Sequence, residues 1–425
     1  MGILELKDWQ AVLLAFGSSM FIAWYSLPKI IKVAKYRRLT DKPGKHKIHR
    51  GEIPTLGGVA IFGGFSFGVL LAAHGHIQSM AYLMASVLML FFIGLKDDLI
   101  TVTPWKKIFV QVAAGLILCI FTEIRFTNLH GFMGIAGIPV WFSFLLTIFL
   151  IVIIINSFNL IDGIDGLAAA VGIVAGTAFG IWFWLSGDTG FAIASAALTG
   201  SLVVFLWFNM SEGKYKIFMG DTGSLVVGFI LTVMAIRFNE INAGPSPFVK
   251  LNSSPAVSIA ILVVPLFDSL RVIVIRLIRH QPPMKADNRH IHHLLLRAGY
   301  NHKQATILIS LANIIIIVAG FLLRDLSITW LGVSILVLCT LFTVPVYMMV
   351  AKRENWAMYR KNSWKLILTD SREIETYRNM VGIIKDYKVP ADFPVNDLLV
   401  SVKNTGEAAG RSSKARELSE VSREK

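Results

Sequence analysis

The hydrophobic residues of this chain lie in long continuous runs that short polar clusters separate. Residues 142–155, for example, contain almost none of the polar positions that an amphipathic soluble helix carries on one face. A helix needs about 20 apolar residues to cross a hydrocarbon core, and spanning strands would alternate polar and apolar positions instead. The pattern predicts an all-α, polytopic integral membrane protein with about eleven spans, near residues 10–27, 55–74, 79–95, 108–122, 138–155, 164–186, 189–209, 222–238, 255–276, 304–323 and 328–350.

The composition supports a membrane protein. Of the 425 residues, 55% are hydrophobic and only 16% are charged, and the mean hydropathy is +0.63, whereas soluble domains carry about 25% charged residues. The first run has no basic segment before it and no small-residue cleavage site after it, so we expect a retained span. Cys119 and Cys339 fall inside spans without a spacing motif, so a structural disulfide is not expected. We expect a transmembrane domain over 1–350 and a cytoplasmic tail over 351–425, with 402–425 disordered.

Lysine and arginine residues are concentrated in alternate loops. The loop after the first span is basic from Lys29 to Arg50, and the loops after the third, seventh and ninth spans are also basic. In contrast, residues 75–78 contain neither residue type, and residues 324–327 contain only Arg324. The positive-inside rule therefore predicts an inner (cytoplasmic) membrane protein with its N-terminus outside and its C-terminus and polar clusters inside. Anionic membrane lipid then accounts for the net charge of +14, without a nucleic-acid partner.

Two adjacent carboxylates, Asp97 and Asp98, follow Lys96 at the inner end of the third predicted span. Neighbouring negative charges repel each other, and a nearby cation or a shared proton relieves that repulsion. Lys107, one turn into the next span, can face the same space. A solvated helix end is the alternative interpretation of this cluster.

A second polar cluster directly follows the apolar run over 142–155. It contains Asn156, Asn159, Asp162 and Asp165, at intervals of three residues that keep the side chains on one slowly drifting helix face. The glycines after the two aspartates favour a broken or closely approached backbone. Amides and carboxylates of this kind can bind a metal, a nucleobase or a sugar, and a polar helix cap is the alternative.

Residues 218–224 read Phe-Met-Gly-Asp-Thr-Gly-Ser, just before the eighth predicted span. Asp221 or Thr222 could cap that helix, and a glycine-containing helix N-terminus is also a natural seat for phosphate. A carboxylate beside a phosphate repels it unless a cation bridges the two, and hard oxygen ligands suit Mg²⁺. The pattern therefore predicts a magnesium site at Asp221.

The loop after the ninth span contains Arg289, His290, His292 and His293. Three closely spaced histidines are typical of a zinc site, but no cysteine or acidic residue lies at zinc-ligand spacing. Histidine and arginine donors that reach a diphosphate are the favoured interpretation. A solvated basic loop is the alternative.

The ninth span also contains a carboxylate, Asp268, a few residues after Pro265. An ionisable group inside a span is a functional candidate by default. Its predicted partner is Arg271 or Arg276, and a purely structural ion pair explains it equally well.

Residues 41–58 form a basic string that contains His49 and ends in a Pro-Thr-Leu-Gly-Gly sequence. A rigid, basic entrance of this kind suits anionic lipid or nucleotide phosphate. Electrostatic contact with lipid alone is the alternative.

In this order, these strings resemble the polyprenyl-phosphate N-acetylhexosamine-1-phosphate transferases of the glycosyltransferase family 4 type. The resemblance covers about residues 20–350, nearly every predicted span. Residues 290–299 are similar to the branch that transfers GlcNAc-1-phosphate from UDP-GlcNAc to undecaprenyl phosphate, because Leu294 and Leu295 stand where the peptidoglycan translocase has an acidic residue. The resemblance implies transfer of N-acetylhexosamine-1-phosphate from a UDP-sugar to polyprenyl phosphate, with release of UMP. Such a reaction forms the first lipid-linked sugar of a cell-envelope polysaccharide pathway.

The resemblance also implies cofactor, partner and residue roles. The cofactor is Mg²⁺, for which Mn²⁺ can substitute, and a homodimer is a possible assembly. The implied metal ligand is Asp221; the implied catalytic residues are Asp97, Asp98, Lys107, Asp162 and His292; the implied substrate-binding residues are His49, Asn156, Asn159, Asp165, Asn209, Phe218, Arg289, His290 and His293.

The competing class of protein is a secondary transporter, which also has polar residues within its membrane helices. A transporter needs charged groups near the middle of the membrane, on both sides of a gate. In this chain only Asp268 lies deep within a predicted span, so the sequence favours the enzyme. For the reaction itself we favour direct attack by the lipid phosphate over an aspartyl-phosphate intermediate at Asp162, since the lipid phosphate is already anionic.

Overall fold

The computed structural model describes residues 7–41, 53–73, 77–122, 124–244, 251–282 and 289–368 of the 425-residue chain. His49 and residues 369–425, which include the segment predicted to be disordered, lie outside the described residues. The chain divides into two units after Arg353, and the packing below concerns the described residues up to that point. The domain boundary near residue 350 and the cytoplasmic tail stay predictions.

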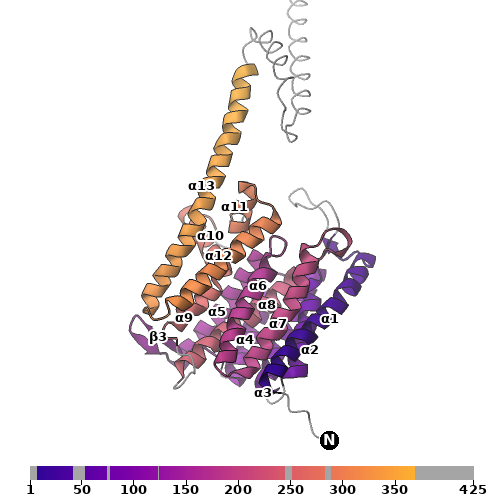
Figure 1. Ribbon diagram of the computed structural model, residues 1–425, viewed down its shortest axis with the longest axis vertical. Helices are drawn as coiled ribbons and strands as arrows, with labels where there is room; N and C mark the ends of the chain where they lie inside the picture. The colour runs from indigo at the N-terminus through magenta and orange to yellow at the C-terminus, as the bar shows by residue number, and fades with distance from the viewer. Residues whose placement is uncertain are drawn as a thin grey trace, which may run out of the picture. The chain divides into compact units, whose positions relative to one another are not determined.

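The described part of the chain is mostly helical (Figure 1). In chain order the helices are α1 (Asp8–Tyr36), α2 (Gly57–Ala72), α3 (Ile77–Leu99), α4 (Pro104–Phe121), α5 (Val140–Ile161), α6 (Leu167–Leu185), α7 (Thr189–Met210), the 3-10 helix η1 (Gly213–Tyr215), α8 (Gly220–Ala243), α9 (Ser254–Ile261), α10 (Val263–Ile278), α11 (Ile291–Ala298), α12 (His302–Leu322) and α13 (Ile328–Leu368).

Within the described ranges, nine helices are long and apolar enough to cross a membrane, and they coincide with nine of the eleven predicted spans. The other two predicted spans differ. Helix α2 has only 16 residues. The segment predicted as one span over 255–276 is broken, because α9 and α10 meet at an angle of 85°. Pro265 lacks the backbone N–H that would bond to Ile261, the last residue of α9, which explains the break.

Two short antiparallel strand pairs lie between helices, and the all-α prediction missed both. Strand β1 (Thr40–Asp41) pairs with β2 (Ile53–Pro54), and β3 (Asn128–Phe132) pairs with β4 (Ile135–Gly137). The β3–β4 hairpin contains four residues with positive φ, namely His130 and Gly131 in β3 and Met133 and Gly134 in the turn. Such tight turns need a left-handed backbone, which glycine adopts at little cost.

Helix α8 forms the centre of the bundle, and nearly every residue from Thr222 to Ile236 is buried. A helix that is apolar all round is buried on all sides. The N-terminus of α8 packs against α2 and α3 so closely that their backbones are in contact. A Cβ atom on Gly58 would lie 2.1 Å from the Gly223 nitrogen, and one on Gly94 would lie 2.6 Å from the Thr222 Cα. These small residues let three helix ends converge where the polar clusters lie.

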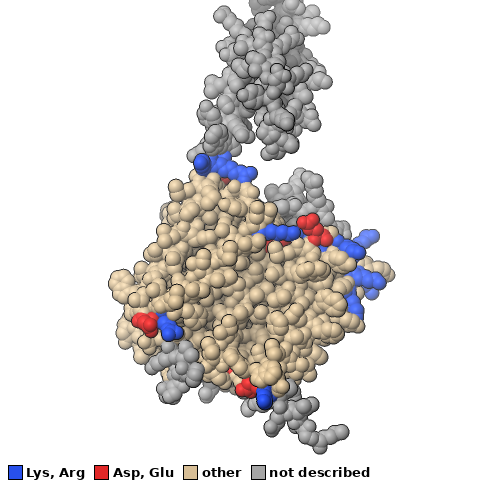
Figure 2. Space-filling model, viewed as in Figure 1, with Lys and Arg blue, Asp and Glu red and all other residues tan. Residues whose placement is uncertain are grey.

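The outer surface of the bundle is apolar. Trp105, Phe109 and Ile315 are 80%, 74% and 62% exposed. Figure 2 shows a broad surface of uncharged residues across the middle of one face, with charged side chains near its margins. Large apolar side chains at this exposure are stable in contact with lipid rather than water. The chain is therefore a multi-pass membrane protein.

Candidate active site

Lys107 joins two of the predicted site carboxylates. Its Nζ atom lies 2.8 Å from Asp97 Oδ2 and also contacts Asp221 Oδ2 in a short ion pair. The three side chains come from α4, α3 and α8, and each is less than a third exposed. The other Asp97 oxygen accepts from the Val102 N–H at 2.6 Å, which ties down the connection between α3 and α4. Two carboxylates thus converge on one cation at the end of the bundle.

The neighbouring Asp98 has a different role, because its carboxylate caps α8. Asp98 Oδ1 accepts from the Asp221 N–H at 2.7 Å. Asp98 Oδ2 accepts from the Thr222 N–H at 3.0 Å and from the Thr222 hydroxyl at 2.5 Å. A carboxylate from α3 thus satisfies two of the amides at this helix start, and phosphate binding there stays a prediction.

The asparagines of α5 face two different partners. Asn159 Nδ2 donates to Asp221 Oδ1 at 2.9 Å, so this amide belongs to the Lys107 cluster. Asn156 Nδ2 donates to Gln111 Oε1 at 3.0 Å and to the Val152 carbonyl at 2.7 Å. Gln111 is fully buried in α4 and was not identified from the sequence. The available signal was a single amide within an otherwise apolar span.

Asp162 lies at the end of α5, just outside the predicted span. Among the described residues, no group donates a hydrogen bond to its carboxylate. Burial, followed by the negative charges of Asp221, Asp98 and Asp165, raises the pKa of Asp162 well above its ordinary value. These surroundings favour the neutral form of the side chain, and a cation bound nearby would favour the ionised form.

Asp165 is paired with two basic residues that the sequence analysis did not assign to the site. Its Oδ2 atom lies 2.6 Å from Lys216 Nζ and 2.9 Å from His302 Nδ1, and its carbonyl accepts from the Thr306 hydroxyl at 2.8 Å. Burial alone would raise the pKa of Asp165, but the hydrogen bonds from His302 and Lys216 outweigh it and lower that pKa. The separation of these partners along the chain left no sequence signal beyond their charge.

Asn209 and Phe218 hold the loops around Asp165. The amide of Asn209, only 4% exposed, accepts from the Gly166 N–H at 2.5 Å and donates to the Ile217 carbonyl at 2.7 Å. The Phe218 backbone bonds on both sides to the segment before α2, and Lys216 Nζ lies 5.9 Å from the centre of its half-buried ring. Asn209 thus positions the backbone of both loops, whereas the Phe218 side chain is half-buried.

The loop that contains Arg289, His290, His292 and His293, here called the histidine loop, packs onto the α5–α6 connection. His290 Nδ1 lies 2.8 Å from Asp268 Oδ2, and Arg289 Nη2 lies 3.5 Å from Gln281 Oε1. His292 is 1% exposed, and neither of its ring nitrogens has a hydrogen-bond partner among the described residues. A Cβ atom on Gly163 would lie 2.4 Å from His292 Nε2, so only glycine leaves room for this ring.

Charge and stacking within the histidine loop favour a neutral His292. Burial, and next the charge of His293, lowers the pKa of His292 to about 3. The rings of His292 and His293 have centroids 4.2 Å apart, and the rings of His292 and His290 stack at 5.7 Å with an interplanar angle of 9°. At neutral pH, His292 can therefore donate only as a neutral imidazole.

The donor set of the Lys107 cluster fits magnesium. Across the described ranges, no three His, Cys, Asp or Glu side chains converge as a metal site. However, Mg²⁺ is commonly held by only one or two carboxylates together with substrate phosphates. Asp97 and Asp221 already converge on the Lys107 ammonium, and Asn159 adds an amide beside Asp221. These hard oxygen donors suit the ion that the sequence predicts.

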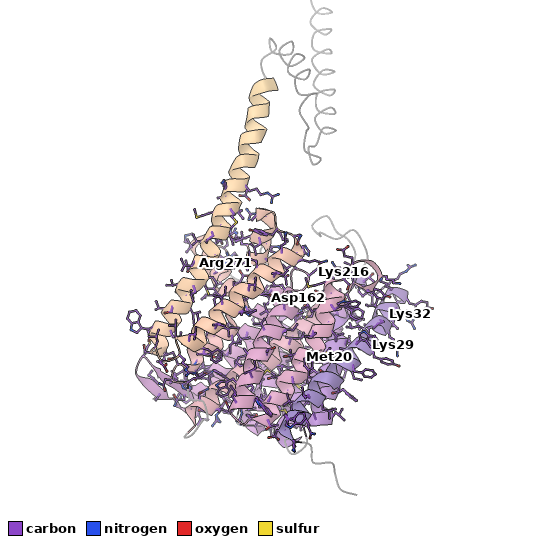
Figure 3. All side chains as sticks on the ribbon, viewed as in Figure 1. Met20, Lys29, Lys32, Asp162, Lys216 and Arg271 are labelled. Atoms are coloured by element: carbon purple, nitrogen blue, oxygen red, sulfur yellow. The ribbon has the colours of Figure 1, made fainter. Side chains whose placement is uncertain are left out.

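The site residues that are described therefore gather at one end of the bundle. Figure 3 shows Asp162, Lys216 and Arg271 toward this end. The predicted residues in this region are Asp97, Asp98, Lys107, Asn156, Asn159, Asp162, Asp165, Asn209, Phe218, Asp221, Arg289, His290, His292 and His293.

Comparison with known proteins is consistent with this geometry. The glycosyl transferase family 4 model matches residues 80–239, which include Asp97, Lys107 and Asp221. An undecaprenyl-phosphate alpha-N-acetylglucosaminyl 1-phosphate transferase of Escherichia coli (strain K12) is 33% identical over 296 residues, 68% of this chain and 78% of that protein. The protein of the same name from Yersinia pestis is 31% identical over 292 residues, with the same two coverages of 68% and 78%.

A more distant relative covers a larger share of the chain. A probable undecaprenyl-phosphate N-acetylglucosaminyl 1-phosphate transferase of Bacillus subtilis (strain 168) is 28% identical over 337 residues, 78% of this chain and 90% of that protein. Residues 80–239, which the family model matches, contain the polar strings around Asp97, Asn159 and Asp221. The chain belongs to glycosyl transferase family 4, among the polyprenyl-phosphate N-acetylhexosamine-1-phosphate transferases.

Proposed function

We propose that the protein transfers N-acetylhexosamine-1-phosphate, most directly GlcNAc-1-phosphate, from a UDP-sugar to undecaprenyl phosphate and releases UMP. The observation that carries the proposal is the convergence of Asp97 and Asp221 on Lys107, where α3, α4 and α8 meet. The names of the relatives support the lipid acceptor and the sugar phosphate. The product would be the first lipid-linked sugar of a cell-envelope polysaccharide pathway.

The reaction needs positioning and charge compensation more than covalent chemistry. An oxygen of the lipid phosphate attacks the phosphorus that carries the sugar, and the bond from that phosphorus to UMP breaks. UMP leaves with the electron pair. Lys107 supplies a positive charge beside the two carboxylates, and Asn159 orients Asp221 through its 2.9 Å hydrogen bond. Asp97 is the better candidate for a base, because it lies beside Asp221 and Lys107, whereas Asp98 caps the start of α8.

Asp162 favours direct attack. Its pKa is raised by burial and by neighbouring carboxylates, which favours the neutral form of the side chain in the absence of a bound cation. A neutral carboxyl is a poor nucleophile, whereas the lipid phosphate is already anionic. We therefore assign no aspartyl-phosphate intermediate to Asp162.

Mg²⁺, or Mn²⁺ in its place, is the proposed cofactor. Asp221 is its proposed protein ligand, with Asp97 as the second carboxylate within reach of the same position. A bound divalent ion would supply positive charge that compensates the charge developing on the leaving UMP. Lys107 must then shift away from at least one carboxylate, since all three groups now contact each other.

The nucleotide is proposed to bind beside the α5–α6 connection. Phe218 offers a half-buried ring, and Asp165 lies next to it through their shared neighbour Lys216. The histidine loop lies on the other side of Gly163 and brings His290, His292 and His293 toward the same region. These donors, with Asn156, Arg289 and His49, are the proposed contacts for the nucleotide, the diphosphate and the sugar.

The membrane arrangement completes the proposal. The basic loops favour an N-terminus outside, a C-terminus inside and a site that faces the cytoplasm, with α2 and the bent α9–α10 pair as the tenth and eleventh membrane segments. The enzyme would act in the inner (cytoplasmic) membrane. A homodimer stays a prediction.

A donor panel tests the proposed function. Purified protein is mixed with undecaprenyl phosphate, Mg²⁺ and one UDP-sugar at a time, and UMP is measured by chromatography. UDP-N-acetylhexosamines, and UDP-GlcNAc most of all, should release UMP, and Asp221→Asn should lose most of this turnover although the variant still folds. Absence of UMP with every donor, together with uptake of a solute into protein-containing vesicles, would indicate a transporter instead.

A further inference from the structure

Asp268 lies where α10 meets the histidine loop, and its carboxylate is 2% exposed. Its Oδ2 atom is 2.8 Å from His290 Nδ1, and its Oδ1 atom accepts from the Ile291 N–H at 2.9 Å. A buried carboxylate is costly unless its oxygens are satisfied by hydrogen bonds and a nearby positive charge. Two of its three partners belong to the histidine loop, so the Asp268 carboxylate holds that loop in place.

Arg271 supplies the positive charge that compensates the Asp268 carboxylate. It is one of the two partners, Arg271 or Arg276, that the sequence predicted. Its Nη2 atom donates to Asp268 Oδ1 at 2.6 Å and to the Arg289 carbonyl at 2.7 Å, and its Nη1 atom donates to the Tyr347 hydroxyl of α13. The rigid guanidinium fork makes all three bonds at once, which the single ammonium of a lysine cannot do in this geometry. Arg271 thereby links α10, α13 and the histidine loop.

The same contacts determine which nitrogen of His290 carries a proton. An ionised carboxylate only accepts hydrogen bonds, so the Nδ1 atom that faces Asp268 must be the donor. In the neutral ring, Nε2 is then an acceptor that points away from Asp268. A carboxylate behind a histidine commonly fixes its tautomer and ring orientation in this way.

We propose that Asp268, Arg271 and Tyr347 form a positioning unit that fixes residues 289–291 and the tautomer of His290, and that turnover depends on this unit through His290. The kinetic part of the inference rests on the proposed function. Among the described residues, Asp268 and Arg271 form no hydrogen bond or ion pair with Asp97, Lys107 or Asp221, so they are positioning residues rather than catalytic ones.

A double-mutant cycle tests the dependence on His290. Asp268→Asn should lower kcat roughly 10- to 100-fold, the usual cost of losing a carboxylate behind a functional histidine, with little change in KM for the UDP-sugar. In a His290→Ala background the same substitution should cost less than about threefold, because coupled residues are not additive. Arg271→Lys and Tyr347→Phe are milder variants. They should also lower kcat with little change in KM, and the loss should again be smaller in the His290→Ala background. Equal losses in both backgrounds would overturn the proposal, since they would mean that Asp268 acts by another route.

Hydrogen–deuterium exchange tests the positioning without any assay of activity. Asp268→Ala removes the acceptor of the Ile291 N–H, so exchange in residues 289–296 should accelerate at least about tenfold. Asp188→Ala is the matched control, because Asp188 pairs with Arg237 at 2.8 Å near the other end of α8. Unchanged exchange in Asp268→Ala would contradict the positioning unit. A wild-type protein that forms no product would defeat the proposed function, whereas the exchange result would still decide whether the unit holds the loop.

Discussion

At the scale of single residues, adjacent carboxylates have separate roles because their helix directs them to different partners. Asp97 contacts a lysine from α4, whereas Asp98 accepts two backbone amides and a hydroxyl from α8. Capping contributes stability, and an ion pair beside a reacting phosphate contributes to turnover. In the proposed mechanism, the pair that looks like one motif in the sequence therefore divides into a structural carboxylate, Asp98, and a reactive one, Asp97.

Substitution should separate these two roles. Asp98→Ala should lower the free energy of unfolding by about 1–2 kcal/mol, because the start of α8 loses its cap. Asp97→Asn should lower turnover far more than it lowers stability. Thermal unfolding and UMP release, measured on both variants, check this. If Asp97→Asn were the less stable variant of the two, the assignment of the cap would be wrong.

Asp162 should make stability depend on pH in a defined direction. Its pKa in the folded protein lies above the value in the unfolded chain, so the folded state retains a proton that the unfolded state loses as pH rises. Stability from this group is therefore complete below the unfolded pKa and is lost as pH rises toward the folded pKa. Asp162→Asn removes the effect.

The melting temperature of Asp162→Asn, relative to that of wild type, should therefore increase between pH 5 and pH 8. The comparison is made in EDTA, because a bound cation would stabilise the ionised carboxylate. A difference that stays constant over this range would show that Asp162 does not titrate as its surroundings require.

At the scale of elements, the start of α8 depends on the absence of side chains on its neighbours. Gly58→Ala would place a Cβ atom 2.1 Å from the Gly223 nitrogen, and that backbone cannot move without displacing Asp221. The variant should lose about 1–3 kcal/mol of stability or more, and turnover with it. The cost follows from backbone contact rather than from helix propensity.

Gly63→Ala is the matched control in the same helix, because a Cβ atom there has no neighbour within 4 Å. It should be neutral, or more stable by up to about 1 kcal/mol, since alanine is the better helix former. Folded yield and thermal unfolding of the two variants provide the measurement. Equal behaviour of the two would contradict the close crossing of α2 and α8.

At the scale of the whole molecule, the length of each apolar run determined which membrane spans the sequence could predict. Nine spans were located because each is a continuous apolar run of sufficient length. The α9–α10 break was missed because a single proline inside an apolar run does not show whether a helix kinks or ends. The β3–β4 hairpin was missed because its strands, 128–132 and 135–137, are too short to show an alternating pattern.

The candidate site was predictable in its residue types and less so in its pairings. The strings around Asp97, Asn159 and Asp221 could be identified from the sequence because they are polar residues at the ends of apolar runs. The sequence did not predict that Asp98 caps α8 or that His302 pairs with Asp165. The first contact joins residues that are 124 positions apart in the chain, and the second joins residues that are 137 positions apart. A single sequence, read by itself, carries no signal for such long-range contacts.

Orientation is a testable property of the whole molecule. In a background that lacks Cys119 and Cys339, Lys214→Cys and Met133→Cys place one cysteine in an exposed position on each side. A membrane-impermeant maleimide should label Met133→Cys in intact cells and should label Lys214→Cys only after lysis. The opposite labelling pattern would reverse the proposed topology.

The most direct test of the mechanism follows one phosphorus atom. UDP-GlcNAc labelled at its β-phosphorus is incubated with the protein, Mg²⁺ and undecaprenyl phosphate, and the lipid extract and the aqueous phase are counted separately. Transfer of sugar-1-phosphate predicts label in the lipid and unlabelled UMP in the aqueous phase, and almost no transfer by Asp221→Asn. Labelled UDP in the aqueous phase beside an unlabelled glycolipid would show transfer of the sugar alone and would contradict the mechanism.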